Sequence, residues 1–301
     1  MLQHDVESYS EAGYCLDEAT GKHRPPHGAP AGKKGLPVVG ANVYWEHPSA
    51  EVLVMRYRWT HWPAGVTERW LPGEPCPPAV RDWVLQGGAI EAHNNMFERL
   101  AWHHVLTPQH GFPEPRPEQW HCSAATARVN ALPRGLERLG EALGLDTRKD
   151  AEGKRLMRKF SMPRDRTKLD QRTRILPSEE PIEFAAYDQY CATDVLVEAE
   201  AMSRMAPMTP DERRFWLIDQ EINWRGIAID RAGVRDCIAV LDEALERYGA
   251  ECRAITGGLG PSQVTALLGW INGRLASVPP APVAARVPTP LEDFLEDDIP
   301  F

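Results

Sequence analysis

The sequence has few cysteines and no long apolar run, and these absences exclude several classes of protein. Its six cysteines are scattered through 301 residues without a C-x-x-C pair, which argues against a zinc cluster or a disulfide framework. No run of apolar residues is long enough for a membrane span, and acidic and polar residues begin by position 5, which argues against a signal peptide. We therefore expect a cytoplasmic protein without a membrane partner.

Positive charge is also scarce overall, but it is unevenly distributed. The formal net charge is −9, yet residues 146–174 contain eleven Lys and Arg against five Asp and Glu. Residues 291–301 contain five acidic residues and no basic one. The basic segment suits either the neutralisation of phosphates or a salt-bridged surface, and charge alone favours neither interpretation.

Sequence patterns predict strands early in the chain and mainly helices later. Extended runs predict strands at 2–8, 51–59, 66–71 and 89–92. Helical patterns cover residues 77–86, 95–106, 123–132, 135–143, 152–160 and 183–205. Gly/Pro-rich residues 21–40 predict a surface insertion, and polar residues 161–180 predict a mobile loop. This order is typical of an α+β or mixed α/β domain.

Helices and a linker are predicted for the last third of the chain. One helix runs from 210 through Asn223, and others cover 234–255 and 262–272. Apolar spacings of four and three over 234–255 suit packing along another helix, although an amphipathic helix lying on the main domain explains them equally well. Pro-rich sequence from 279 predicts an extended linker. The predicted domains are 1–206, 207–276 and 277–301.

Acidic residues from three distant segments form the most specific pattern. Asp5 and Glu7 lie two apart in a predicted strand and therefore share a face. Tyr190 and Asp194 share a face of a predicted helix, and Glu98 lies in the first turn of a helix that follows a strand. Carboxylates bind hard divalent cations, and two such ions about 4 Å apart activate water for phosphodiester hydrolysis. The set predicts a two-metal nuclease.

Each of these residues also has a simpler interpretation. Asp-x-Glu pairs occur often by chance, and Asn95 with Glu98 fits a helix capping box. Tyr190 and Asp194 suit the surface of an ordinary amphipathic helix. Only the joint occurrence of the residues, in this order, favours a metal site.

The order and flanks of the motifs resemble the 3′–5′ exonuclease domain of bacteriophage-type family-A DNA polymerases, in the tyrosine branch of the DEDD superfamily. The three motifs read DVESYS from Asp5, AHNNMFE ending at Glu98, and YCATD from Tyr190 to Asp194. Residues 219–230 resemble the junction that leads into a polymerase thumb. The resemblance spans roughly residues 1–275, which is most of the chain.

This resemblance implies an α/β fold with an RNase H-like mixed sheet flanked by helices, followed by a small helical thumb-like segment and a disordered acidic tail. It implies that Asp5, Glu7, Glu98 and Asp194 hold two Mg²⁺ or Mn²⁺ ions, and that Tyr190 orients the attacking water. The implied reaction shortens single-stranded or frayed DNA from its 3′ end and releases nucleoside 5′-monophosphates. Glu98 departs from the family pattern, which usually has Asp there.

Contacts with the DNA substrate are expected from two groups of residues. The candidates for holding the terminal nucleotide are Asn94, Asn95 and Phe97, and Phe97 fits a core position equally well. The candidates for contacting phosphates are Lys154, Arg155, Arg158 and Lys159. Phosphate contacts of this kind make binding sensitive to salt.

The sequence lacks the palm and fingers motifs of a complete polymerase of this family. The resemblance therefore implies an exonuclease without polymerase activity, acting in DNA replication or repair in a bacterial or phage-infected cell. Two alternatives stay open. One is a non-catalytic DNA-binding adaptor, and the other is one subunit of a split family-A polymerase whose palm lies on a separate chain.

The final residues resemble the acidic tip of bacterial single-stranded DNA-binding proteins. The residues that carry this resemblance are Asp297, Asp298, Ile299, Pro300 and Phe301. In that family the terminal Phe enters an apolar pocket and its carboxylate meets a basic residue. The resemblance implies that host proteins which read this tip are partners. Docking onto the chain's own basic segment and a generic acidic tail are the alternatives.

Overall fold

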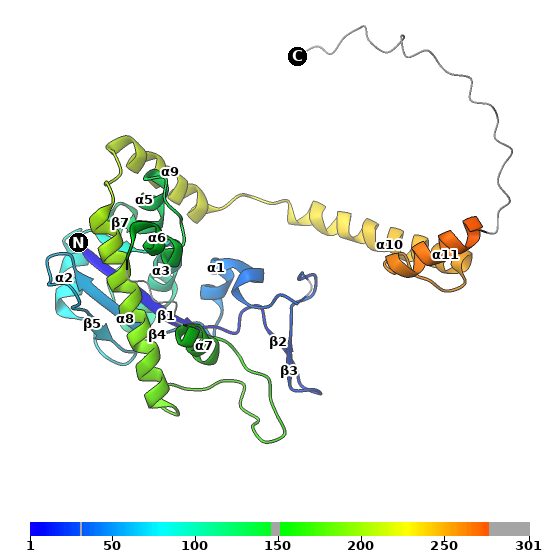
Figure 1. Cartoon of the computed structure of the whole chain (residues 1–301), viewed down its shortest axis with the longest axis horizontal. Coiled ribbons are helices and arrows are strands. Elements are labelled where there is room, and N and C mark those ends of the chain that lie inside the picture. The colour runs from blue at the N-terminus through cyan, green and yellow to red at the C-terminus, as the bar shows by residue number, and fades with distance from the viewer. Residues whose placement is uncertain (31, 146–150, 277–301) are drawn as a thin grey trace, which may run out of the picture. The chain divides into compact units, whose positions relative to one another are not determined.

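The computed structural model describes residues 1–30, 32–145 and 151–276 (Figure 1). Contacts within the chain define two compact units, Met1–Gly226 and a second unit that begins at Ile227. Helix α9 (Pro210–Arg225) therefore belongs to the first unit. The predicted boundary after residue 206, which marks the end of the expected catalytic domain, stays a prediction. The predicted linker and acidic tip lie outside the described residues.

A mixed five-stranded sheet forms the centre of the first unit, in the order β5-β4-β1-β6-β7. Its strands are β1 (Leu2–Tyr9), β4 (Glu51–Trp59), β5 (Glu68–Trp70), β6 (Ile90–Ala92) and β7 (Trp120–Cys122). Strand β1 pairs antiparallel with β4 and parallel with β6. With helices on both faces, this is the predicted α/β fold with an RNase H-like sheet, and the predicted fold class is confirmed.

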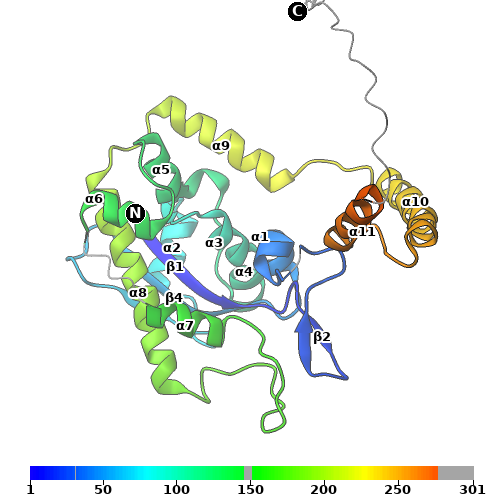
Figure 2. The same ribbon diagram turned by 45° about the vertical axis from the view of Figure 1, so that its right-hand side comes forward.

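Helices cover the two faces of this sheet, and Figure 2 shows α8 on one side of β1 and α3 on the other. The helices of the first unit besides α9 are α1 (Leu36–Glu46), α2 (Pro78–Leu85), α3 (Met96–Ala101), α4 (Thr107–His110), α5 (Ser123–Val129), α6 (Leu136–Leu143), α7 (Ala151–Phe160) and α8 (Pro181–Arg204). A π-helical turn, Trp102–Leu106, joins α3 to α4, and a 3₁₀ turn, Pro117–Gln119, precedes β7. Proline at the start of α2, α8 and α9 suits the first helical turn, where its missing N–H costs nothing.

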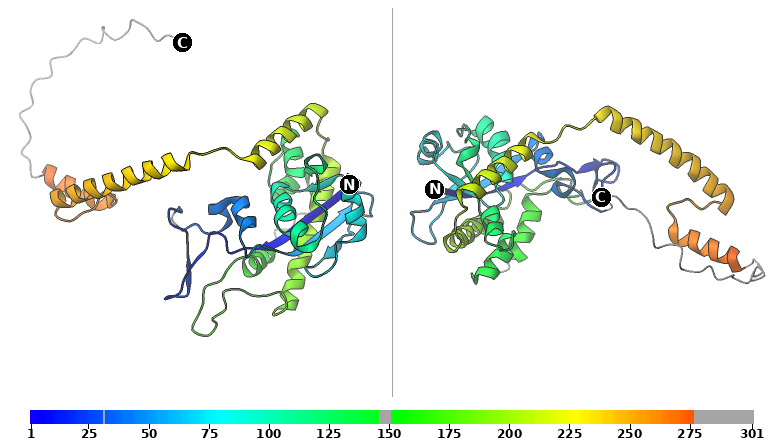
Figure 3. Two further views of the ribbon diagram at one scale, coloured as in Figure 1. Left: turned by 180° about the vertical axis from the view of Figure 1, so that it is seen from behind. Right: turned by 90° about the horizontal axis from the view of Figure 1, so that it is seen from above.

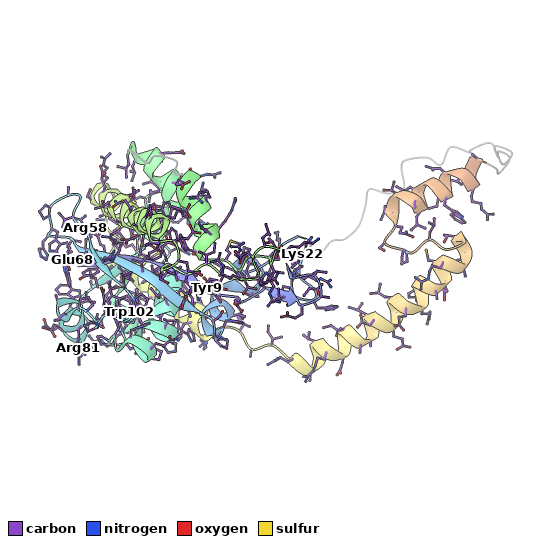
Figure 4. All side chains as sticks on the ribbon, turned by 90° about the horizontal axis from the view of Figure 1, so that it is seen from below. Tyr9, Lys22, Arg58, Glu68, Arg81 and Trp102 are labelled. Atoms are coloured by element: carbon purple, nitrogen blue, oxygen red, sulfur yellow. The ribbon has the colours of Figure 1, made fainter. Side chains whose placement is uncertain are left out.

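The alternation of side chains along β1 divides the core into two layers. Leu2 and Val6 belong to the same buried cluster as Trp102, which is labelled in Figure 4. Tyr9, on the opposite face of the strand, belongs to the cluster that contains Tyr187 of α8. Because successive side chains of a strand point to opposite faces, residues 5 and 7 share the face that α8 covers.

The predicted surface insertion at residues 21–40 contains more regular structure than its Gly/Pro content indicated. Strand β3 (Lys22–Arg24) pairs with β2 (Cys15–Asp17), and α1 begins at Leu36. The glycines permit a close backbone approach, since a Cβ on Gly13 would lie 2.9 Å from the backbone of Gly35. Residues 161–180 contain no helix or strand, in agreement with a loop, and the mobility of this loop stays a prediction.

The second unit contains α10 (Arg231–Thr256) and α11 (Val264–Ala276). The apolar residues spaced by four and three along α10 include Ile238, Leu241 and Leu245, and all three are exposed. The two predicted packing arrangements for this helix therefore stay predictions. In the described part of the chain, no helix has the length and apolar content needed to cross a membrane.

A buried ion pair connects α8 to the sheet and yields a stability prediction. Asp188 accepts hydrogen bonds from Arg56 Nε and Nη2, each at 2.5 Å, and lies 3.4 Å from Arg69 Nη1. We expect Asp188→Ala to lower the free energy of unfolding by about 3 kcal/mol, because Arg56 would stay largely buried without its counter-charge. Urea denaturation measures this loss.

The matched control is Glu200→Ala on the same helix, since Glu200 pairs with Arg204 in solvent. An exposed pair of this kind contributes about 1 kcal/mol or less. Equal losses of unfolding free energy in the two variants would show that the buried Asp188 pair stabilises the protein no more than the exposed Glu200 pair.

Candidate metal centre

Strand β1 and helix α8 bring two predicted metal ligands beside a cysteine. The ligand atoms of Asp5, Glu7 and Cys191 all lie within 4.8 Å of one another. Asp5 and Glu7 share a face of β1 as predicted, and α8 runs along that strand (Figure 3). A register shift between β1 and β4 falls directly after Glu7. Irregular pairing of this type often re-aims a side chain near a functional site.

Glu98 and Asp194 belong to the same electrostatic cluster. Glu98 is buried at the start of α3, and burial together with the negative charge of Asp5 raises its pKa well above the ordinary value. Burial raises the pKa of Asp5 to about 6. Burial, Asp5, Asp194 and Glu98 all raise the pKa of Glu7 well above its usual range. Asp5 and Glu7 thus share a compact group of ligand atoms with Cys191, while Glu98 and Asp194 lie outside that group but close enough for their charges to raise the pKa of Glu7.

The donor set of this cluster fits divalent cations. Like-charged carboxylates held away from water repel one another, and a cation between them offsets both the repulsion and the cost of burial. Glu98 also has a buried carboxylate oxygen, Oε2, with no hydrogen-bond partner among the described residues. Carboxylate oxygens are the ligands that Mg²⁺ and Mn²⁺ prefer. Which residues bind a metal stays a prediction.

The capping-box interpretation of Asn95 and Glu98 is wrong. Asn95 occupies the N-cap position of α3, but its side chain makes no capping hydrogen bond. Its Nδ2 is buried without a partner in the described part of the chain. Glu98 is therefore not needed to complete the helix end, which leaves its carboxylate to the acidic cluster.

Tyr190 is held in a stack of three aromatic rings. The rings of Phe160 and Tyr187 lie 5.8 Å apart between centroids, and those of Tyr187 and Tyr190 lie 6.3 Å apart, with interplanar angles of 16° and 13°. Burial, followed by the negative charges of Asp194, Glu7 and Asp5, raises the pKa of Tyr190. The phenol therefore stays protonated at neutral pH and can donate a hydrogen bond.

Two residues of the cluster were missed by sequence reasoning. The Tyr187 hydroxyl donates a hydrogen bond to Glu7 and lies 2.8 Å from Ser161 Oγ. Cys191 Sγ donates to Asp5 Oδ2 at 3.5 Å. Tyr187 lies three residues before Tyr190, so extending the helical stripe by one turn would have found it, and Cys191 lies between Tyr190 and Asp194, three residues before the latter.

The predicted nucleotide-contacting residues have different surroundings. Asn94 is exposed and its Oδ1 accepts a hydrogen bond from Arg134 at 3.2 Å. Asn95 is buried, whereas Phe97 is half-buried with its ring 5.0 Å from that of Trp45. Their contact with a nucleotide stays a prediction, and the core interpretation of Phe97 agrees with its packing.

Most of the predicted phosphate-contacting residues on α7 are already in ion pairs. Arg155 pairs with Glu152 and Glu183, Lys159 pairs with Glu180 and Glu183, and Lys154 lies 3.4 Å from Glu137. Arg158 is exposed. The salt-bridged interpretation therefore describes three of the four side chains, and phosphate binding by this helix stays a prediction.

Fold and site together define an α/β protein with an RNase H-like sheet and a cluster of carboxylates suited to divalent cations. Over 241 residues the chain is 33% identical to the protein named DNA polymerase from Bacillus phage SP02. The aligned region covers 78% of this chain and 36% of that protein, so the chain spans about a third of its relative's length. No protein-family model matches the chain. The chain is thus related to a phage DNA polymerase.

A glycine in α7 makes room for the Tyr190 ring and yields a second prediction. A Cβ on Gly153 would lie 2.1 Å from Tyr190 Cδ2, much closer than atoms approach in a packed core. We expect Gly153→Ala to lower the free energy of unfolding by about 1–3 kcal/mol through overpacking. In a Tyr190→Ala background the same substitution should raise the free energy of unfolding by about 0.4–1 kcal/mol, because alanine has fewer accessible conformations than glycine in the unfolded chain.

Denaturation of the four proteins in this double-mutant cycle measures the coupling between the two residues. Gly269→Ala in α11 is the matched control, since no atom lies within 4 Å of a Cβ there. An effect of Gly153→Ala with the same sign in both backgrounds would contradict the proposed fit between Gly153 and the ring.

Proposed function

We propose that the chain is a metal-dependent 3′–5′ exonuclease that hydrolyses phosphodiester bonds at single-stranded or frayed DNA 3′ ends. It would release nucleoside 5′-monophosphates and have no polymerase activity of its own. The observation that carries this proposal is the close grouping of Asp5 and Glu7 on β1 of an RNase H-like sheet, where the charges of Glu98 and Asp194 act on Glu7 and those of Asp194, Glu7 and Asp5 act on Tyr190. The similarity to a phage DNA polymerase supports DNA as the substrate.

In this proposal residues 1–206 form the catalytic domain, and the four carboxylates hold two Mg²⁺ or Mn²⁺ ions. Bound ions of this kind lower the pKa of a water and stabilise charge on the leaving 3′ oxygen. The residues around the carboxylates keep them in place. Tyr187 orients Glu7 through its hydroxyl, and the Cys191 thiol orients Asp5. Hydrogen bonds to ligands typically strengthen a metal site in this way.

Tyr190 has a separate role in the proposed reaction. The ring stack holds the phenol beside the carboxylates, and its raised pKa keeps the hydroxyl protonated. A protonated hydroxyl donates a hydrogen bond and does not act as a general base at neutral pH. Tyr190 would therefore orient the attacking water and leave the removal of its proton to another group.

The central prediction concerns Asp5→Ala combined with Glu7→Ala. We expect the rate of 3′ shortening to fall about 10³-fold or more, because the loss of metal ligands removes several kcal/mol of transition-state stabilisation. Single-stranded DNA labelled at the 3′ or the 5′ end, incubated with Mg²⁺ or Mn²⁺, reports the direction of digestion. Calorimetric titration with Mn²⁺ should show the loss of metal binding in the same variant.

Glu200→Ala, an exposed acidic position on α8, is the control and should digest DNA at the parent rate. A parent protein that shows no metal-dependent 3′ shortening overturns the proposal and favours the adaptor or the split polymerase. Equal activity in the double variant would show that the cluster is not the active site.

A narrower prediction isolates the hydroxyl of Tyr190. Tyr190→Phe keeps the ring in the stack with Tyr187, so Mn²⁺ affinity and stability should change little. We expect kcat to fall by about 10²-fold with KM nearly unchanged, because a water-orienting contact acts mainly in the transition state. A change confined to KM would instead assign Tyr190 to DNA binding.

A further inference from the structure

A groove of about 800 Å³ lies between α9 and the segment that contains α3 and the 3₁₀ turn before β7. Three arginines line it: Arg99 from α3, and Arg213 and Arg214 from the first turns of α9. The acidic residues of the lining are Glu118 and Glu221, and the charge of Glu118 acts on both Arg99 and Arg213, so two acidic residues partly offset three arginines. The groove therefore has an excess of positive charge.

Arg99 is the unusual member of this lining. The residue as a whole is 8% exposed, and its guanidinium lies 4.0 Å from the centroid of the Trp224 ring. Burial lowers its pKa, and the negative charges of Glu114 and Glu118 only partly offset this effect. A buried charge is normally paired, because removing it from water is costly. Stacking on Trp224 fixes the plane of the guanidinium and leaves its N–H donors for an anion.

The two arginines of α9 extend this positive surface. Arg213 is half-buried, lies 4.6 Å from the Trp216 ring centroid and donates one hydrogen bond to the Glu118 carbonyl oxygen at 2.9 Å. Arg214 is exposed. Both directly follow the first turn of α9, which contains Asp211 and Glu212, so the positive potential here comes from the arginines themselves and not from the helix dipole. Two of the three guanidiniums are thus held in place by tryptophan rings.

Helix α3 connects this groove to the candidate metal centre. Glu98 and Arg99 are consecutive residues, so they point about 100° apart around the helix. Glu98 faces the carboxylate cluster, whereas Arg99 faces the groove. A ligand that neutralises Arg99 therefore binds against the helix that positions a predicted metal ligand.

We propose that this groove binds the phosphate backbone of a single-stranded nucleic acid at a second place, outside the metal centre. Arg99, Arg213 and Arg214 would each contact phosphate oxygens. A groove of 800 Å³ exceeds what one inorganic phosphate fills, and arginines on two separate elements suit successive phosphates of a strand. The choice of nucleic acid as ligand rests on the proposed exonuclease function.

The test measures binding of a fluorescein-labelled oligothymidylate to the full chain by anisotropy, in chelator and over a series of salt concentrations. Each lost phosphate contact should reduce the slope of log K against log salt by about 0.7. We expect Arg213→Gln combined with Arg214→Gln to reduce the slope by about 1.4, and Arg99→Gln by about 0.7. Arg128→Gln on α5, also exposed, should leave the slope unchanged.

Titrations with small anions distinguish binding of a strand from binding of a single phosphate. Inorganic phosphate and thymidine 5′-monophosphate, titrated alone, should bind the parent no better than the Arg213/Arg214 variant. A slope equal to the parent's in a folded Arg213/Arg214 variant overturns the proposal, as does tight binding of free phosphate that these substitutions abolish. Because Arg99 is buried, the α9 variant keeps the test valid if Arg99→Gln does not fold. Binding in chelator is independent of hydrolysis, so failure of the groove and failure of the exonuclease proposal are distinguishable.

Discussion

The packing of α8 against β1 is the constraint on which the rest of the first unit depends. It places Asp5 and Glu7 against the stripe of α8 that contains Tyr190 and Asp194, and it buries acidic groups that repel one another. A fold holds such a cluster only if other packing offsets the cost. The buried pair between Asp188 and Arg56 supplies part of that packing, because it joins the same helix to β4.

Helix α7 and Ser161, the residue that follows it, also hold this arrangement in place. Phe160 continues the ring stack, Ser161 lies within hydrogen-bond distance of Tyr187, and Gly153 leaves space for Tyr190. Helix α7, which is notable in the sequence mainly for its positive charge, therefore also packs against the aromatic rings of α8. Its lysines and arginines are largely paired with the acidic residues of neighbouring helices, which favours an architectural role for much of that charge.

The long elements could be predicted from sequence because their patterns are local. Strand β4 and helices α2, α7 and α8 lie within about two residues of their predicted positions, since β-branched runs, amphipathic periods and prolines act over a few residues. The hairpin β2–β3 and helix α1 were missed. Their residues are rich in glycine and proline, and they are ordered by contacts such as the hydrogen bond from Arg166 N to the Gly21 carbonyl, far away in the chain.

Sequence by itself determined the residue types, the spacing of each motif and the fold class, because same-face geometry follows from strand and helix periods alone. Tertiary structure decided which motifs meet. It left Glu98 out of a capping box and within reach of the charge of Asp5, added Tyr187 and Cys191 to the cluster, and buried Arg99 against Trp224. These outcomes depend on contacts between segments far apart in sequence. Local spacing contains no information about such distances.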